Sequence, residues 1–173
     1  MISLVIPNES HQAEYARVMD QWEALEDNIQ PQLMRRYSDR LKANVDFAKW
    51  LSWCEDDRTT GSMLSTGVPC TLYFLMSGGK EILGSIVINH GNTRRGHMHA
   101  GIVPWQRGRG YGTQMLRLAL AKAAEMGMEQ VFICPDKGNF GAIEIILRNG
   151  GVLVEEFDDN GLASLRYEIP AQD

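Results

Sequence analysis

The sequence predicts a single α/β (α+β) domain over residues 1–173, with a mixed, mostly antiparallel sheet of about seven strands flanked by about four helices. Three observations support this prediction. The chain has 173 residues and 44% of them are hydrophobic, which is enough to bury a core without disulfides or metals. Runs typical of strands and of helices are interleaved. No repeat, low-complexity tract or flexible linker divides the chain.

The first half of the chain predicts two helices and three strands. Apolar residues spaced three and four apart indicate a helix from about Ser10 to Glu26, and a shorter helix is expected over 44–54 after an irregular stretch at 31–38. Two strand-like runs flank the turn at 77–80, as in a β-hairpin. The strands expected here are 3–6, 71–76 and 82–89.

The second half predicts a crossover followed by a hairpin. A strand at 97–103 leads into the clearest amphipathic helix, over 109–127, and then into a short buried strand at 130–134. A helix over 140–148 follows, with Asn139 placed to cap it. The last strands, 152–157 and 162–169, are joined by a turn at 158–161.

The charge balance limits the partners that we expect. Lysine and arginine total 17 against 22 aspartate and glutamate, giving a net charge of -5. This balance argues against non-specific nucleic-acid binding, which depends on neutralising phosphates. It is compatible with amine-bearing partners and with a homodimer.

The beginning of the chain and its cysteines indicate the compartment. Residues 1–7 contain neither a basic region nor an apolar run long enough for a signal peptide or a membrane span, so we expect a cytoplasmic protein that does not bind membranes. Cys54, Cys70 and Cys134 are far apart in sequence, so we expect reduced thiols and no metal site.

A glycine-rich segment lies between the strand at 97–103 and the long helix. It contains Gly108, Gly110 and Gly112, and its other residues include Arg107, Arg109, Tyr111 and Thr113. Glycines let successive backbone N–H groups point at one anion, and a helix N-terminus adds unpaired donors and partial positive charge. A pyrophosphate-binding loop is therefore predicted here.

Two other phosphate motifs do not match this segment. A Walker A loop requires a lysine that is absent, and a dinucleotide-binding fingerprint requires glycine where Thr113 stands. The remaining alternative is a solvent loop with incidental glycines. The order of strand, glycines and amphipathic helix favours the phosphate loop.

The run Arg107-x-x-Gly110-x-Gly112, following Ile102-Val103-Pro104, resembles the [Q/R]xxGx[G/A] motif of the GNAT superfamily of N-acetyltransferases. The resemblance covers about 70–168 well and the first helices only by order. It implies a twisted sheet whose fourth and fifth strands diverge, acetyl-CoA as the acyl donor, and enzymatic acetyl transfer to a primary amine in a ternary complex.

The resemblance also implies which residues bind the donor. The backbone of Ile102 and Val103 would contact the pantetheine arm, and the amides from Gly108 to Thr113 would hold the pyrophosphate. Arg107 would contact phosphate, or would be a solvated arginine. Asn139 would contact the arm of CoA, or would only cap its helix.

The sequence departs from the family where the catalytic acid is expected. The tyrosine of the family falls at Ile146 in this chain, so the general acid is missing. His99, with His97 on the same strand face, is a candidate base, because histidine titrates near neutral pH. Cys134 is a second candidate catalytic residue near the thioester, and a buried structural cysteine is its alternative.

The acceptor is expected to bind at the first two helices. Glu23, Glu26 and Asp27 could attract an amine or form a solvated face, and Trp22, Trp50 and Trp53 could line a pocket or belong to the core. Two alternatives to small-molecule acetylation stay open. One is a CoA-binding sensor without turnover, and the other is transfer to a protein N-terminus or lysine.

Overall fold

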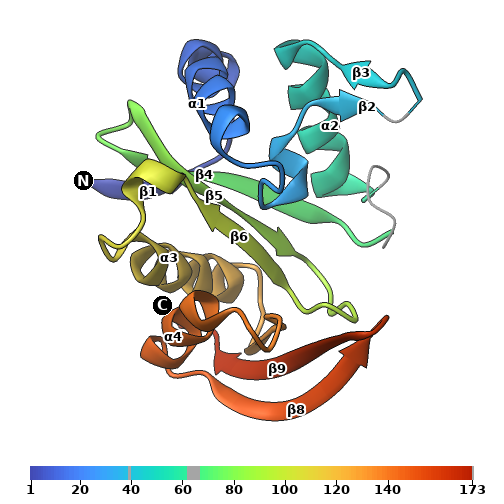
Figure 1. The fold of residues 1–173 in the computed structure, drawn as a ribbon, viewed down its shortest axis with the longest axis vertical. Coiled ribbons are helices and arrows are strands. Elements are labelled where there is room, and N and C mark those ends of the chain that lie inside the picture. The colour runs from blue at the N-terminus through green and yellow to red at the C-terminus, as the bar shows by residue number, and fades with distance from the viewer. Residues whose placement is uncertain (39, 62–66, 173) are drawn as a thin grey trace.

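The computed structural model describes residues 1–38, 40–61 and 67–172 (Figure 1). In this part of the chain one sheet has the order β1-β4-β5-β6 and a second has the order β7-β9-β8. The strands are β1 (Ile2–Val5), β4 (Cys70–Ser77), β5 (Glu81–Asn89), β6 (Met98–Ile102), β7 (Gln130–Ile133), β8 (Val152–Asp159) and β9 (Leu162–Pro170). A small hairpin adds β2 (Tyr37–Ser38) and β3 (Ala43–Asn44). Pairing within each sheet is antiparallel, which confirms the mostly antiparallel prediction.

The four predicted helices are confirmed. They are α1 (Gln12–Leu25), α2 (Phe47–Thr59), α3 (Tyr111–Glu125) and α4 (Phe140–Arg148). Figure 1 shows α1 and α2 on one face of the four-stranded sheet and α3 and α4 on the other. None of the helices in the described ranges is long and apolar enough to cross a membrane.

Helix α2 extends beyond the predicted end at residue 54. The Asp46 side chain caps its start by accepting the Lys49 N–H at 2.7 Å. Its buried face continues past Trp50 and Cys54 to Asp57, which is 1% exposed. The spacings of four and three keep these residues on one face, so the acidic run at 55–57 does not end the helix.

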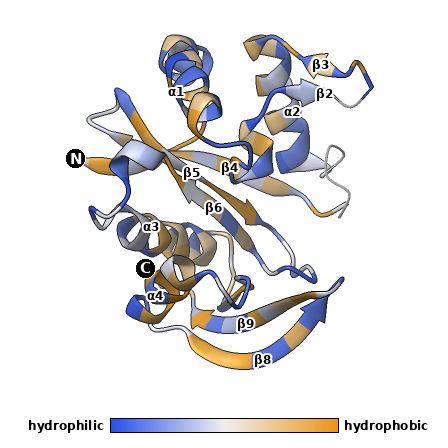
Figure 2. Ribbon diagram, viewed as in Figure 1, coloured by the Kyte–Doolittle hydropathy of each residue, from blue (hydrophilic) through white to orange (hydrophobic). Residues whose placement is uncertain are grey.

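Two hydrophobic clusters fill the two sides of the four-stranded sheet. The first lies under α1 and α2 and contains a group of aromatic rings, including Tyr15 and Trp50, whose planes are tilted by 32° with centroids 4.7 Å apart. The second lies against α3 and α4 and includes Leu116, Leu120 and Val131. The edge strand β8 remains apolar and half exposed at 152–154 (Figure 2).

Strands β6 and β7 meet at one end and belong to different sheets. The His97 N–H donates to the Phe132 carbonyl at 2.7 Å, and the Phe132 N–H donates to His97 Nδ1 at 2.9 Å. Gly96 bridges to Ile133 beside them. A Cβ on Gly96 would lie 2.4 Å from the Phe132 carbonyl oxygen, so this contact requires glycine. The crossover from β6 through α3 to β7 therefore ends in a localised contact between two sheets.

Candidate functional site

The glycine-rich segment connects β6 to α3 through a short 3-10 turn at Pro104–Gln106. Gly108 and Gly110 have φ of +76° and +84°, a left-handed conformation that glycine adopts without strain. Nothing lies within 4 Å of the Cβ position of either residue. No side chain caps α3 at its N-cap residue, Gly110. The start of α3 therefore has no side-chain cap, and the backbone before it leaves room for an anion to approach.

Gly112 is explained by packing between two helices. A Cβ at this position would lie 2.5 Å from Cδ1 of Ile145 on α4. The carboxamide of Asn149 supports the same approach by donating to the Thr113 carbonyl at 3.2 Å. Tyr111, in the same helical turn, packs against the second hydrophobic cluster. The third glycine of the motif therefore brings α4 next to the start of α3.

Arg107 is held by groups far from it in sequence. Its guanidinium donates to both oxygens of Glu26 at 2.5 and 2.9 Å, and its Nε donates to the Ile102 carbonyl at 3.0 Å. Glu26 also accepts the indole N–H of Trp22 at 2.8 Å. These bonds from Arg107 and Trp22 hold the pKa of Glu26 below its usual range. Arg107 is therefore bonded to Glu26 and Ile102 while its side chain stays 46% exposed, and its contact with phosphate stays a prediction.

The other predicted donor-binding residues differ in their surroundings. Arg109 is exposed and forms no ion pair with the residues that the structure describes. Val103 is buried, and its N–H donates to the Leu83 carbonyl at 3.0 Å. Asn139 caps α4, since its side-chain oxygen accepts the Ala142 N–H at 3.2 Å. Of the two arginines in the glycine-rich segment, Arg107 is paired with Glu26, and Arg109 has a charge that is free to bind a phosphate.

His99 lies on the sheet face that α1 and α2 cover. It pairs directly with Val87, whose side chain belongs to the cluster beneath those helices, and opposite residues of an antiparallel pair share a face. Gly101, two positions after His99 on the same face, lies against the loop after α1, because its Cβ would meet the Gln30 carbonyl oxygen. Burial, and then the nearby charge of Arg95, lower the pKa of His99. His99 is therefore uncharged at neutral pH and can accept a proton.

The contacts of His97 give it a structural role. Its ring lies 5.8 Å from the Phe132 ring between centroids, and its Nδ1 accepts the Phe132 N–H. An accepting Nδ1 requires the neutral tautomer with the proton on Nε2. Burial, followed by the charge of Arg166, lowers the pKa of His97. His97 thus joins β6 to β7.

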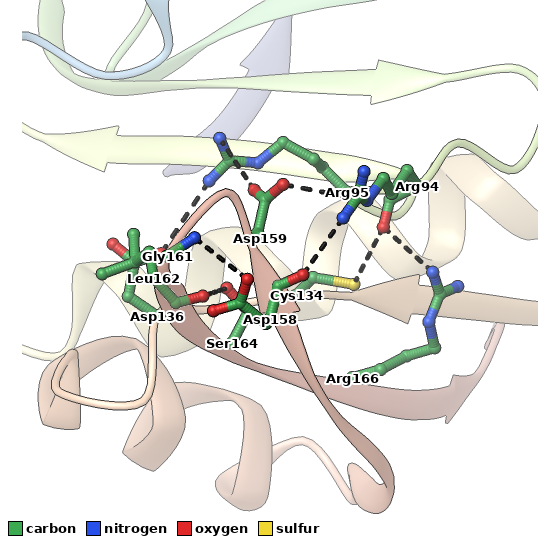
Figure 3. A network of polar contacts seen from close by, with 10 residues as sticks. All are labelled: Arg94, Arg95, Cys134, Asp136, Asp158, Asp159, Gly161, Leu162, Ser164 and Arg166. Carbon is green, nitrogen blue, oxygen red and sulfur yellow. Dashed lines mark hydrogen bonds and ion pairs between the residues drawn. The ribbon is translucent and has the colours of Figure 1, made fainter.

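Cys134 lies just after β7 in a network of charged side chains (Figure 3). Its thiol contacts the Arg94 carbonyl at 3.9 Å, and burial raises the pKa of the thiol. Arg95 forms ion pairs with Asp159 at 3.5 Å and Asp136 at 3.8 Å. After burial, the charge of Arg95 lowers the pKa of His99, and the same charge partly opposes the effect of burial on the pKa of Cys134.

Two further features concern a metal ion and a hydroxyl acid. The described ranges contain no group of three histidine, cysteine or acidic side chains suited to a metal ion. Ile146, where the tyrosine of the family falls, is 2% exposed and packs in the second cluster. That position therefore stabilises the core.

The residues singled out at the first two helices separate into three environments. Trp22 is fully buried in the core, and Glu26 is committed to Arg107. Trp50, Trp53 and Asp27 line a cavity of about 380 Å³ between the loop after α1 and helix α2. Tyr37 and Asp57 also line it, and the sequence pattern did not identify either, because no local motif reports which residues a loop brings against a helix.

Three solved structures share this fold over nearly the whole chain. A putative acetyltransferase from Salmonella typhimurium, solved with its cofactor acetyl-CoA, is 14% identical with a TM-score of 0.63, covering 99% of this chain and 95% of that chain. The microcin C7 self-immunity acetyltransferase, in complex with acetyl-CoA and AMP, is 13% identical with a TM-score of 0.65, covering 98% and 92%. A spermidine N-acetyltransferase chimera of Vibrio cholerae and hSSAT sequences is 12% identical with a TM-score of 0.64, covering 98% and 95%.

A family model, matched to the amino-acid sequence, identifies the family of this chain. A comparison with curated proteins finds no significant match. The model of the acetyltransferase (GNAT) family, however, matches residues 18–150, which is well over half of the chain. The matched range includes β6, the glycine-rich segment and α3. This chain belongs to the acetyltransferase (GNAT) family.

Proposed function

We propose that this protein transfers an acetyl group from acetyl-CoA to a primary amine, by direct attack of the amine in a ternary complex. The observation that carries the proposal is the uncapped N-terminus of α3, preceded by left-handed Gly108 and Gly110 with open space at both Cβ positions. A pyrophosphate fits such a cradle because it can approach the backbone N–H groups without a clash. Two structurally similar acetyltransferases contain acetyl-CoA.

The donor site that we propose extends from the end of β6 to the start of α4. The backbone of Ile102 would face the pantetheine arm, whereas the Val103 N–H and carbonyl are bonded to Leu83 and Gln106. Asn139 would add a contact from the cap of α4. The N–H groups of Gly108 to Thr113 would hold the pyrophosphate, with Arg109 supplying a free charge and Arg107 a charge shared with Glu26. The donor contributes a thioester carbonyl, which an amine can attack.

His99 is the base that we propose. An amine reaches the enzyme mainly as its ammonium ion, and His99, uncharged at neutral pH, takes one proton from it. The freed lone pair then attacks the thioester carbonyl and the carbon–sulfur bond breaks. The second proton, which the nitrogen loses as the amide forms, passes to the departing sulfur, so that CoA leaves as thiol. Holding the amine and the thioester close together in a reactive orientation supplies most of the rate acceleration.

Direct transfer is favoured over an acetyl-cysteine intermediate. Burial raises the pKa of Cys134, so this thiol keeps its proton at neutral pH, whereas the thiolate is the nucleophilic form. The free cysteines Cys54 and Cys70 also have pKa values raised to about 12 by burial. Reduced cysteines agree with action in the cytoplasm.

A small amine is favoured over a peptide acceptor by the cavity beside the loop after α1, because it is bounded on several sides and carries acidic side chains. The test follows thiol release from acetyl-CoA with a panel of small amines and amino-terminal and lysine peptides. We expect release with at least one small amine and intersecting double-reciprocal lines. Tight acetyl-CoA binding without release for any acceptor would support a sensor, which the buried Ile146 would suit. Parallel lines would indicate an acetyl-enzyme.

A further inference from the structure

The free edge of β6 is the part of the first sheet that the arm of the proposed donor would meet. In the described part of the chain, β6 is the last strand of its sheet and has β5 on one side. The Val103 N–H donates to the Leu83 carbonyl across this pair, and successive residues of an antiparallel strand alternate in the direction of their backbone groups. The N–H and carbonyl of Ile102 therefore point away from β5, along the free edge.

A side chain already lies at this edge. Arg107 donates its Nε–H to the Ile102 carbonyl at 3.0 Å, and its two terminal nitrogens donate to the Glu26 carboxylate at 2.5 and 2.9 Å. The guanidinium thus spans the distance from the edge of β6 to the end of α1. A pantetheine amide that pairs with Ile102 like an added strand must place its own N–H in front of the same carbonyl oxygen. Arg107 has to move before that pairing can form.

The position of Arg107 is fixed from the side of the core. Its partner Glu26 also accepts the indole N–H of Trp22 at 2.8 Å. Trp22 is fully buried in the cluster beneath α1 and α2, so its indole cannot follow a displaced carboxylate. Glu26 is therefore held at the end of α1, and through two hydrogen bonds it holds the guanidinium in front of Ile102.

The contacts of Arg107 can nevertheless be exchanged for others. Its side chain is 46% exposed and that of Glu26 is 30% exposed, and ion pairs with such exposure are weak. A phosphate can replace the Glu26 carboxylate, since both accept two parallel hydrogen bonds from a guanidinium. The proposed pyrophosphate site begins at the next residue, Gly108. A donor with a pyrophosphate supplies this replacement, and a donor without one does not.

We propose that Arg107 is a specificity-determining residue, which makes binding at the edge of β6 depend on the pyrophosphate of the donor. This inference rests on the proposed donor site. Pantetheine thioesters without a pyrophosphate bind poorly, because Arg107 stays bonded to Ile102 and Glu26. When acetyl-CoA binds, the guanidinium turns to the pyrophosphate and the Ile102 carbonyl becomes free for the arm.

Isothermal titration calorimetry of the full chain with S-acetylpantetheine tests the proposal. This probe has the arm and the thioester of acetyl-CoA and lacks its phosphates. We expect Arg107→Gln to bind S-acetylpantetheine about two- to tenfold more tightly than the wild type, because the wild type must first break a hydrogen bond of ordinary net strength. An unchanged or lower affinity, or no detectable binding of the probe by the variant, would overturn the proposal.

Two further variants separate this contact from the charge of Arg107. Arg107→Lys keeps the charge but cannot form the fork-like bond to Glu26 that fixes the side chain in front of Ile102. We expect it to bind S-acetylpantetheine more tightly than the wild type and to lose less acetyl-CoA affinity than Arg107→Gln does. An affinity of Arg107→Lys for S-acetylpantetheine equal to that of the wild type would contradict the proposal.

Arg109→Gln is the matched control, because it removes the other arginine of the glycine-rich segment, which forms no ion pair with the described residues. It should weaken acetyl-CoA binding and leave S-acetylpantetheine binding unchanged. An equal gain in S-acetylpantetheine affinity for Arg109→Gln and Arg107→Gln would assign the gain to a general change in the segment and reject the role of Arg107.

The acetyl-CoA titrations distinguish failure of this inference from failure of the proposed function. If the wild type does not bind acetyl-CoA, the proposed donor site is wrong and the inference falls with it. If acetyl-CoA binds and Arg109→Gln weakens its binding, the donor site stands. An unchanged affinity of Arg107→Gln for S-acetylpantetheine then rejects only the role of Arg107.

Discussion

The carboxylate of Glu26, at the end of α1, binds the guanidinium of Arg107 through two hydrogen bonds of 2.5 and 2.9 Å. The pair joins the end of α1 to the glycine-rich segment, and Arg107 Nε continues the connection to the Ile102 carbonyl. Both side chains are partly exposed, so we expect the pair to contribute less than about 1 kcal/mol to stability. Its effect should be visible mainly in donor binding.

Glu26→Gln should tighten acetyl-CoA binding about two- to fivefold, because removing a carboxylate next to Arg107 increases the positive potential at the proposed pyrophosphate site. Calorimetry at low and high salt measures the change, which added salt should reduce. Glu23→Gln, an exposed neighbour on α1, is the control. Weaker acetyl-CoA binding by Glu26→Gln would instead mean that the ion pair holds the loop in its binding conformation.

Gly110→Asp should weaken acetyl-CoA binding by at least tenfold. The substitution introduces a Cβ at φ of +84° and a carboxylate at the uncapped end of α3, where we place the pyrophosphate. Gly110→Ala introduces the backbone strain without the charge and serves as the control. Unchanged calorimetric affinity in Gly110→Asp would exclude the assignment of this loop to the donor.

Gly101→Ala should destabilise the protein by about 1–3 kcal/mol, because its Cβ would meet the Gln30 carbonyl oxygen at 2.0 Å and backbone cannot rotate away as a side chain can. Urea denaturation measures this change. Gly112→Ala is the comparison, since its Cβ meets the terminal methyl group of Ile145, which can move. A stability of Gly101→Ala equal to that of the wild type would show that the loop does not rest on β6 in solution.

His99→Gln should lower kcat/KM by on the order of 10²-fold or more at neutral pH, as the loss of a general base does. Because burial lowers the pKa of His99, the wild-type rate should rise with pH through a value below the ordinary histidine pKa of about 6.5 and then level. The variant should lack this inflection. An unaltered rate and pH profile would remove His99 as the base.

His97→Gln should reduce the dependence of stability on pH. The pKa of His97 is lowered in the folded protein, so its stabilising contribution is complete above the unfolded value of about 6.5 and is lost as pH falls below it, when protonation removes the acceptor of the Phe132 N–H. Urea denaturation at pH values of about 7.5 and 5.5 compares the proteins. An equal loss of stability in both would assign the pH dependence to other groups.

The sequence predicted the elements better than their contacts. The amphipathic pattern over 109–127 predicted α3 within two residues at each end, because the period of apolar residues is a local property. The prediction of a phosphate-binding loop also rests on adjacent residues, and its binding role stays a prediction. The bond between Glu26 and Arg107 could not be predicted, because the two residues are 81 positions apart. Gly112 is also required because Ile145 on α4 packs against it, and the motif alone does not predict this contact.

Tryptophan residues illustrate the same limit. Trp22, Trp50 and Trp53 all lie at helical spacing, and the sequence left open whether they form the core or line a pocket. The structure places Trp22 in the core. Trp50 belongs to the core, where it contacts Tyr15, and also lines the cavity. Whether each tryptophan lies in the core or lines the cavity depends on the path of the loop after α1. A periodic pattern in the sequence does not predict that path.

The contact between Gln30 and Gly101 also bears on how such an enzyme can be redesigned. Changes to residues 27–33 made to alter acceptor choice will move the main chain that rests on β6, and β6 continues directly into the donor loop. Substitutions that keep the backbone path, confined to side chains facing the cavity, are therefore the ones expected to change acceptor preference while leaving donor affinity intact. Insertions or deletions in that loop should alter both together.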